Sequence, residues 1–290
     1  MQTIINLNYD VAVPPPTDLF ELPFMRTAVL ELSLLAVAGG LLGAWIVLRR
    51  LAFFAHAVGG ATFPGLVIAD AAGIRPLIPA LAVALAYAAA VYRAGARAVG
   101  RFGDAVTGVV LAAALATGVV LASDVFHSGA RVDNLLFGSL LAITPGDVWA
   151  AVGAAALAIA ATVARGPAWL ASGFDRAGAR ALGAPVGVAD ALLLGIVAAT
   201  VVAALPAVGA LLTASLFIVP AATVRLVARS VRELLWGSVG LALAEGIAGA
   251  YVALWLDAPP GPAVAVLGGL VFAGVALATT VAPRTVRAAA

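Results

Sequence analysis

Four ionisable side chains stand inside otherwise apolar runs of this sequence, namely Glu31, His56, Asp70 and Glu245. Ionisable residues at membrane depth are costly, and they mark functional sites by default. A neutral imidazole suits zinc, manganese or iron, so His56 is a candidate metal ligand; the alternative is a structural histidine that is hydrogen-bonded to a neighbouring helix. Glu245 either lines a path or is a buried structural partner. Glu31 is expected to form an interfacial ion pair with Arg26, and Asp70 is expected at the outer face.

The residue types that are missing exclude several kinds of chemistry. The chain has no cysteine and no lysine, which rules out disulfides, thiolate metal sites and a Ser–Lys catalytic pair. The His-Glu-x-x-His pattern of a zinc protease is also absent. A phosphate-binding Gly-x-x-x-x-Gly-Lys-Ser/Thr loop needs a lysine, so any ATP hydrolysis has to come from a partner. We therefore predict no enzyme activity and no cofactor.

The composition predicts a membrane protein. The chain is 64% hydrophobic and 10% charged, whereas soluble domains carry about 25% charged residues. Runs of roughly 20 apolar residues, the length that crosses a bilayer as a helix, follow one another along the chain. The predicted fold is all-α, a polytopic transmembrane helical bundle of about 8–9 membrane helices.

The arginines fix the orientation of this bundle. The predicted spans cover residues 26–48, 51–72, 76–92, 104–122, 148–164, 234–256 and 264–281, with two shorter segments between 182 and 224 that are broken at Pro206. Alternating sides from span to span puts thirteen of the sixteen arginines on one face, which is therefore cytoplasmic. The protein is then a multi-pass protein of the inner or plasma membrane. It has an extracytoplasmic leader (1–24), a transmembrane domain (25–283) and a cytoplasmic tail (284–290).

The scattered arginines form no continuous basic stripe, so no nucleic-acid partner is predicted. Repeated small residues such as Gly39-Gly40-x-x-Gly43 are typical of helices that pack closely in lipid.

The longest cytoplasmic loop, residues 165–187, contains a helix signal. Asp175 is a good N-cap residue, the next turns carry Ala, Arg and Leu, and Gly183 with Pro185 supplies a stop. The pattern predicts a short amphipathic helix of about two turns. It is either a plain interfacial connector or a docking element for another protein.

Several segments in a fixed order carry a resemblance to a known family. The chain resembles the membrane permease subunit of the ABC-3 type importers for divalent metals (zinc, manganese or iron). The segments that carry the resemblance are Leu48–Phe54, Leu136–Leu141, Asp175–Gly183, Ala207–Leu212, Ile218–Thr223 and Leu256–Pro262.

The resemblance implies a function and partners. The chain would be a permease subunit that moves a divalent metal ion into the cytoplasm by alternating access, driven by a separate ATPase subunit. It would work as a homodimer in the lipid bilayer and receive its cargo from an extracytoplasmic solute-binding protein, which could dock at the outer turn near Asp257. The short loop helix would be the coupling helix that contacts the ATPase, through Asp175, Arg176, Ala179, Arg180, Leu182 and Gly183.

The chain departs from the family at its metal-binding motif. Family members carry Asp-x-x-x-His after the first span, two ligands on one helix face. Here the Asp position holds His56 and the His position holds Gly60. The candidate metal ligands are therefore His56 and Glu245, the latter as compensation for the missing ligand. Two alternatives stay open, a permease of the same family with a non-standard substrate and an ion-coupled secondary transporter.

Overall fold

The computed structural model describes residues 23–97, 104–125, 138–139, 143–210, 212–256 and 258–281. Most of the predicted leader, the tail, Asp257 and His127, which we expected at the outer face, lie outside these residues. The elements in chain order are α1 (Pro23–Leu48), α2 (Ala52–Ala61), α3 (Phe63–Ala72), α4 (Leu77–Arg97), α5 (Asp104–Val120), the π-helical turn η2 (Leu121–Val125), α7 (Pro145–Phe174), α8 (Arg176–Ala181), α9 (Val186–Val208), α10 (Thr213–Arg225), α11 (Val231–Trp255) and α12 (Pro260–Val281).

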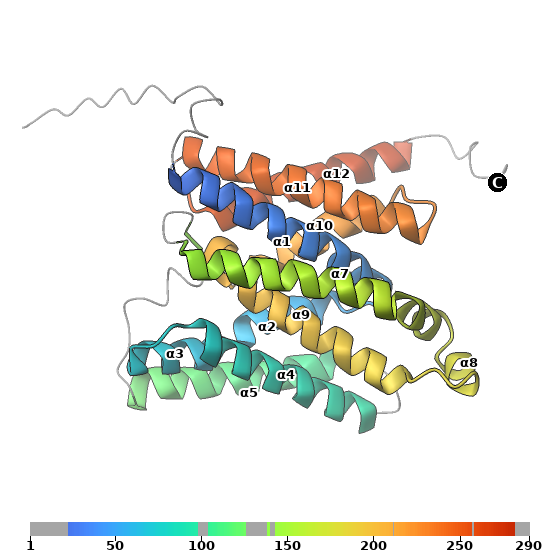
Figure 1. The fold of residues 1–290 in the computed structure, drawn as a ribbon, viewed down its shortest axis with the longest axis horizontal. Coiled ribbons are helices and arrows are strands. Elements are labelled where there is room, and N and C mark those ends of the chain that lie inside the picture. The colour runs from blue at the N-terminus through green and yellow to red at the C-terminus, as the bar shows by residue number, and fades with distance from the viewer. Residues whose placement is uncertain are drawn as a thin grey trace, which may run out of the picture.

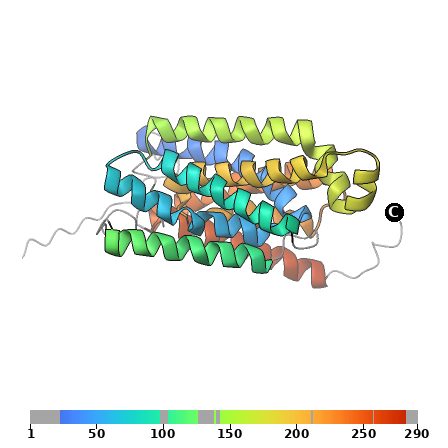
Figure 2. The ribbon, with the colours of Figure 1, turned by 90° about the horizontal axis from the view of Figure 1, so that it is seen from below.

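The all-α prediction is confirmed. Among the described residues, eight helical segments are long and apolar enough to cross a membrane, and the helix Ser215–Arg225 is a shorter apolar one. The segments α2 and α3 form one span, and they are separated only by Thr62, which stands two residues before Pro64. All the long helices run nearly along one axis (Figure 1), and α8 stands at one end of the bundle in both views (Figure 2).

Two predicted helix ends are wrong. We expected a break at Pro206, but α9 continues through this proline and ends at Val208, where Gly209 adopts φ 87°. We also expected a span that ends at Ala164, but α7 continues through Pro167 to Phe174. The inner end of α7 stays helical because Trp169 is fully buried and donates from Nε1 to the Ala189 carbonyl at 2.8 Å. The predicted loop 165–187 is therefore helix over its first half.

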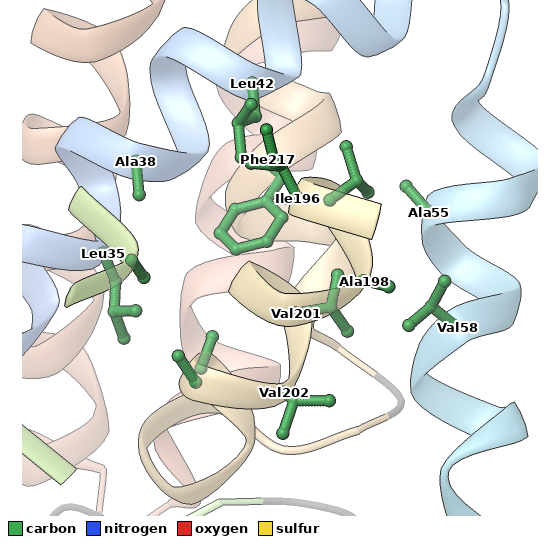
Figure 3. Close-up of a cluster of buried hydrophobic side chains, with 14 of the residues drawn as sticks. Leu35, Ala38, Leu42, Ala55, Val58, Ile196, Ala198, Val201, Val202 and Phe217 are labelled. Carbon is green, nitrogen blue, oxygen red and sulfur yellow. The ribbon is translucent and has the colours of Figure 1, made fainter. Parts of the chain in front are cut away.

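The bundle is centred on α1 and α9. Helix α1 packs against α7, α10 and α11, while α9 packs against α4 and α7, and α2 contacts α9, α5, α4 and α10. Figure 1 shows α11 and α12 on one side of these central helices and α3, α4 and α5 on the other. The central core joins α1, α2, α9 and α10 through apolar side chains (Figure 3), among them Leu42, Val58, Val201 and Phe217.

The predicted small-residue motif in α1 is a close helix contact. A Cβ atom at Gly43 would lie 2.0 Å from the Phe217 carbonyl oxygen of α10, and one at Gly40 would lie 2.5 Å from the Val239 Cα of α11. Since lipid offers no hydrophobic drive between helices, such backbone approach supplies the packing energy.

Non-helical backbone follows α9 inside the bundle. Protein covers it, because a Cβ at Gly59 of α2 would lie 2.0 Å from the Ala210 carbonyl oxygen, and Ser139 N donates to the Pro206 carbonyl. Irregular backbone at membrane depth is tolerated where protein covers it in this way.

Candidate functional site

The turn between α1 and α2 sets the position of His56. Arg50 adopts a left-handed conformation with φ 57°, while its N–H donates to the Val47 carbonyl and the N–H of Leu51 donates to the Ile46 carbonyl. These two bonds form a Schellman motif, which ends α1 sharply. Helix α2 starts at the next residue, Ala52, so the two helices are joined by a short, hydrogen-bonded link.

His56 lies on an outward face of α2. Ala55 and Val58 of the same helix are buried and point toward α9 (Figure 3), whereas the His56 side chain is exposed on the single chain. The residue stands four positions after the helix start, which places it about 6 Å along α2 from the first residue of the helix. Gly60, one turn further, faces Leu111 and Leu115 of α5, since a Cβ there would lie 3.4 Å and 3.9 Å from their methyl groups.

Glu245 lies in the interior, between α10, α11 and α12. The residue is 3% exposed, and its Oε1 atom has no hydrogen-bond partner. A Cβ at Gly268 of α12 would lie 3.0 Å from Glu245 Oε2 and 3.2 Å from a methyl group of Val219. The carboxyl group is thus held in an apolar site of small residues.

One chain does not bring the two candidate ligands together. Helix α2 and helix α11 are separated by α1 and α10, which contact α11 and lie between the two in Figure 1. The described residues contain no group of three or more His, Cys, Asp or Glu side chains that could hold a metal ion. Neither residue lines the cavity of about 250 Å³ between α3, α4, α7 and α9, whose polar wall includes Arg75 and Asp147.

The interfacial ion pair predicted for Glu31 is wrong. Glu31 is fully buried, and neither of its carboxyl oxygens has a hydrogen-bond partner. Although Arg26 is only five residues away, the carboxyl group turns into the bundle, because α1 is packed on several sides by α7, α10 and α11. Asp70 is exposed near the end of α3.

The short helix predicted after Asp175 is present as α8. Asp175 has extended backbone and caps the helix, because its Oδ1 atom accepts from the N–H groups of Ala177 and Gly178 at 3.0 Å each. Gly183 follows with φ 79°, the left-handed conformation that ends helices. Ala179 is the buried side of α8, while Arg180 is exposed.

Two large apolar side chains that flank α8 are exposed. Phe174 before the helix is 95% exposed and Leu182 after it is 90% exposed. Both side chains therefore lie at the exposed end of the bundle where α8 stands.

A buried acidic residue that sequence reasoning missed lies beside α8. The Asp190 side chain of α9 is 1% exposed; its Oδ1 atom accepts from Arg49 Nη2 at 2.6 Å, and its Oδ2 atom lies 2.6 Å from Arg176 Nη1. The sequence does contain a signal for this residue, because Asp190 is an ionisable residue within the apolar run that starts at Val186.

Comparisons with known proteins place the chain in a family. The model of the ABC 3 transport family matches residues 21–279. The manganese transport system membrane protein MntC of Halalkalibacterium halodurans is 28% identical over 256 residues, which are 88% of this chain and 87% of that protein. The chelated iron transport system membrane protein YfeD of Yersinia pestis is 26% identical over 255 residues, covering 87% and 84%.

The fold has a solved counterpart. The structure described as PsaBC from Streptococcus pneumoniae in complex with Fab matches with a TM-score of 0.79 at 23% identity, covering 94% of this chain and 96% of that chain. The family match over nearly the whole length agrees with the apolar helices, the Asp175-capped helix and the coverage of the relatives. The chain is a multi-pass membrane protein that belongs to the ABC 3 transport family.

Proposed function

We propose that this chain is the permease subunit of an ABC importer for a divalent metal ion, with manganese, iron and zinc as the candidate cargoes. Relatives whose names specify manganese or chelated iron transport cover most of this chain. The cargo passes between two copies of the chain, and a separate ATPase drives the change between outward and inward access.

The observation that carries this proposal is the outward position of His56. An imidazole on the exposed face of a membrane-embedded helix is costly in lipid, so it requires either protein or a water-filled cavity beside it. A second copy related by a two-fold axis supplies both, and if that axis runs beside this face of α2, His56 faces its own equivalent across it. Two imidazoles then face one path, and they form an open, weak site for a divalent cation.

An open site of this kind suits transport. A conduit has to release its cargo, so a full set of three or four strong ligands would hold the ion too long. Gly60 removes one ligand from the face that His56 occupies, and a Cβ there would already contact Leu111. Glu245 lies on a different side of the bundle, so it contributes to the path only if the outer helices move.

The exposed end of the bundle is the docking site of the ATPase. Helix α8 carries the buried Ala179 and the exposed Arg180, with Phe174 and Leu182 beside it. Two apolar side chains flanked by guanidinium groups fit a groove with an apolar floor and an acidic rim. When the ATPase is docked there, its ATP-driven closure moves α8 directly. An extracytoplasmic binding protein delivers the metal at the opposite end of the bundle.

The test is the metal content of cells that depend on this chain. Cells that lack the gene are grown under metal limitation and compared with cells that express the wild type, His56→Ala, or the control Val163→Ala on the outside of α7, which is 77% exposed. We expect wild type and Val163→Ala to restore one of the three metals, and His56→Ala to fail. If no metal changes with the wild-type gene, the proposal of metal import is wrong.

A further inference from the structure

We propose that Asp190 is a positioning residue. It connects the coupling helix α8 to the start of α2, so that a movement of α8 is transmitted to His56. This inference rests on the proposed function, because it assumes that an ATPase moves α8. Asp190 itself is not among the residues predicted to bind metal or the ATPase, whereas its partner Arg176 is one of the predicted ATPase contacts.

One buried carboxylate is shared by two arginines from different elements. Arg49 follows α1 and its side chain is 9% exposed, Arg176 belongs to α8 and is 28% exposed, and each contacts a separate oxygen of Asp190 at 2.6 Å. A carboxylate this deeply buried is stable as an ion only when such partners are present. Removing it leaves two guanidinium groups close together without a counter-charge.

Arg49 extends the connection into α7. Its Nη1 atom donates to the Trp169 carbonyl at 2.9 Å and also to the Ser172 hydroxyl, and a Cβ at Gly173 would lie 3.0 Å from its Cδ. Trp169 in turn donates to the Ala189 carbonyl of α9, next to Asp190. The inner ends of α1, α7, α8 and α9 are thus joined through polar contacts that are largely shielded from water.

The same arginine stands directly before the helix that carries His56. Only Arg50 and Leu51 separate Arg49 from Ala52, the first residue of α2, and both make backbone hydrogen bonds to α1. The chain of contacts therefore runs from Arg176 to Asp190, from Asp190 to Arg49, and through two fixed residues into α2. Coupling between distant sites needs a contiguous element of this kind that both sites can bias.

A positioning role and a purely structural role give different results. If Asp190 only holds the fold, its replacement lowers ATP hydrolysis and metal transport together. If it transmits movement, the ATPase still docks on α8 and hydrolyses ATP, while less metal crosses for each ATP consumed.

The experiment measures both quantities in the same vesicles. The full-length chain is reconstituted with its ATPase subunit and binding protein, with manganese as the probe, or whichever metal the cell experiment identifies. Asp190→Asn and Arg176→Gln are compared with the control Arg232→Gln. Like Arg176→Gln, this control removes one positive charge, but from an exposed position at the start of α11. We expect the metal-to-ATP ratio to fall about fivefold or more in the first two variants, the lower range for coupled sites, and to stay at the wild-type value in the third.

Each outcome decides the matter. A wild-type ratio in Arg176→Gln overturns the proposal, and so does a proportional loss of hydrolysis and transport in Asp190→Asn. If Asp190→Asn does not assemble, Arg176→Gln decides alone, since Arg176 is partly exposed and its loss leaves the Arg49–Asp190 pair in place. The double variant should match Asp190→Asn, because both substitutions interrupt one connection. If the wild type itself moves no metal, the proposed function is refuted. This result differs from every result that the variants can give, so the two failures are distinguishable.

Discussion

Removing the N-cap of α8 should weaken ATPase binding without altering the metal path. In Asp175→Ala, the N–H groups of Ala177 and Gly178 lose the carboxylate oxygen that both contact at 3.0 Å. Loss of an N-cap costs about 1 kcal/mol on average. Helix α8 has only six residues, and helices this short are marginal without tertiary support.

The size of the effect follows from the population of folded α8. If only the helical form binds, the apparent Kd rises in inverse proportion to the fraction that is helical. A destabilisation of about 1 kcal/mol changes that fraction by at most about fivefold. The contact between Arg176 and Asp190 holds the helix in part, so the increase in Kd should lie between about two- and fivefold.

A matched substitution separates the cap from the charge. Asparagine caps helices about as well as aspartate, so Asp175→Asn should bind the ATPase with nearly the wild-type Kd. The assay is titration of purified ATPase subunit against the permease in lipid nanodiscs. An equal loss in both variants would refute the capping argument and assign the effect to the negative charge, and an unchanged Asp175→Ala would mean that α8 does not need its cap to bind.

Two other substitutions test the packing. Gly43→Ala should lower the thermal midpoint of unfolding in detergent by a few degrees, because its Cβ would overlap the Phe217 carbonyl oxygen and overpacking costs about 1–3 kcal/mol. The control Gly153→Ala, whose Cβ meets nothing within 4 Å, should raise the midpoint or leave it unchanged. A lower midpoint for Gly153→Ala than for Gly43→Ala would contradict the close contact between α1 and α10. Trp169→Phe removes the donor to the buried Ala189 carbonyl and should lower the free energy of unfolding by about 1–3 kcal/mol. A thermal midpoint equal to that of the wild type would contradict this expectation.

The fold could be predicted from the sequence because its main determinants are local and strong. Long apolar runs and the distribution of arginines indicate the spans and their direction. Asp175, followed by helix formers and Gly183, indicates a short helix, which the structure confirms as α8. The glycines of α1 were interpreted as a packing motif, and their contacts with α10 and α11 bear this out.

The remaining features depend on which helices meet. Pro167 and Pro206 are ordinary helix-ending signals, but tertiary packing around Trp169 and the buried end of α9 keeps both helices intact. Sequence distance also gave Glu31 the wrong partner, since its side chain turns into the bundle. The contact between Asp190 and Arg49 joins residues 141 positions apart, which no local pattern can reveal.

The most direct measurement of the central claim is the water accessibility of position 56 in the assembled transporter. The chain has no cysteine, so His56→Cys and the control Val163→Cys each give one reactive thiol for a membrane-impermeant thiol reagent. If His56 lines a water-filled path between two copies, the thiol of His56→Cys should be labelled in the membrane and protected by manganese or zinc, while the thiol of Val163→Cys should remain unlabelled. If the thiol at position 56 resists the reagent as the one at position 163 does, this face of α2 lies in lipid or in a dry contact, and the proposed path is contradicted.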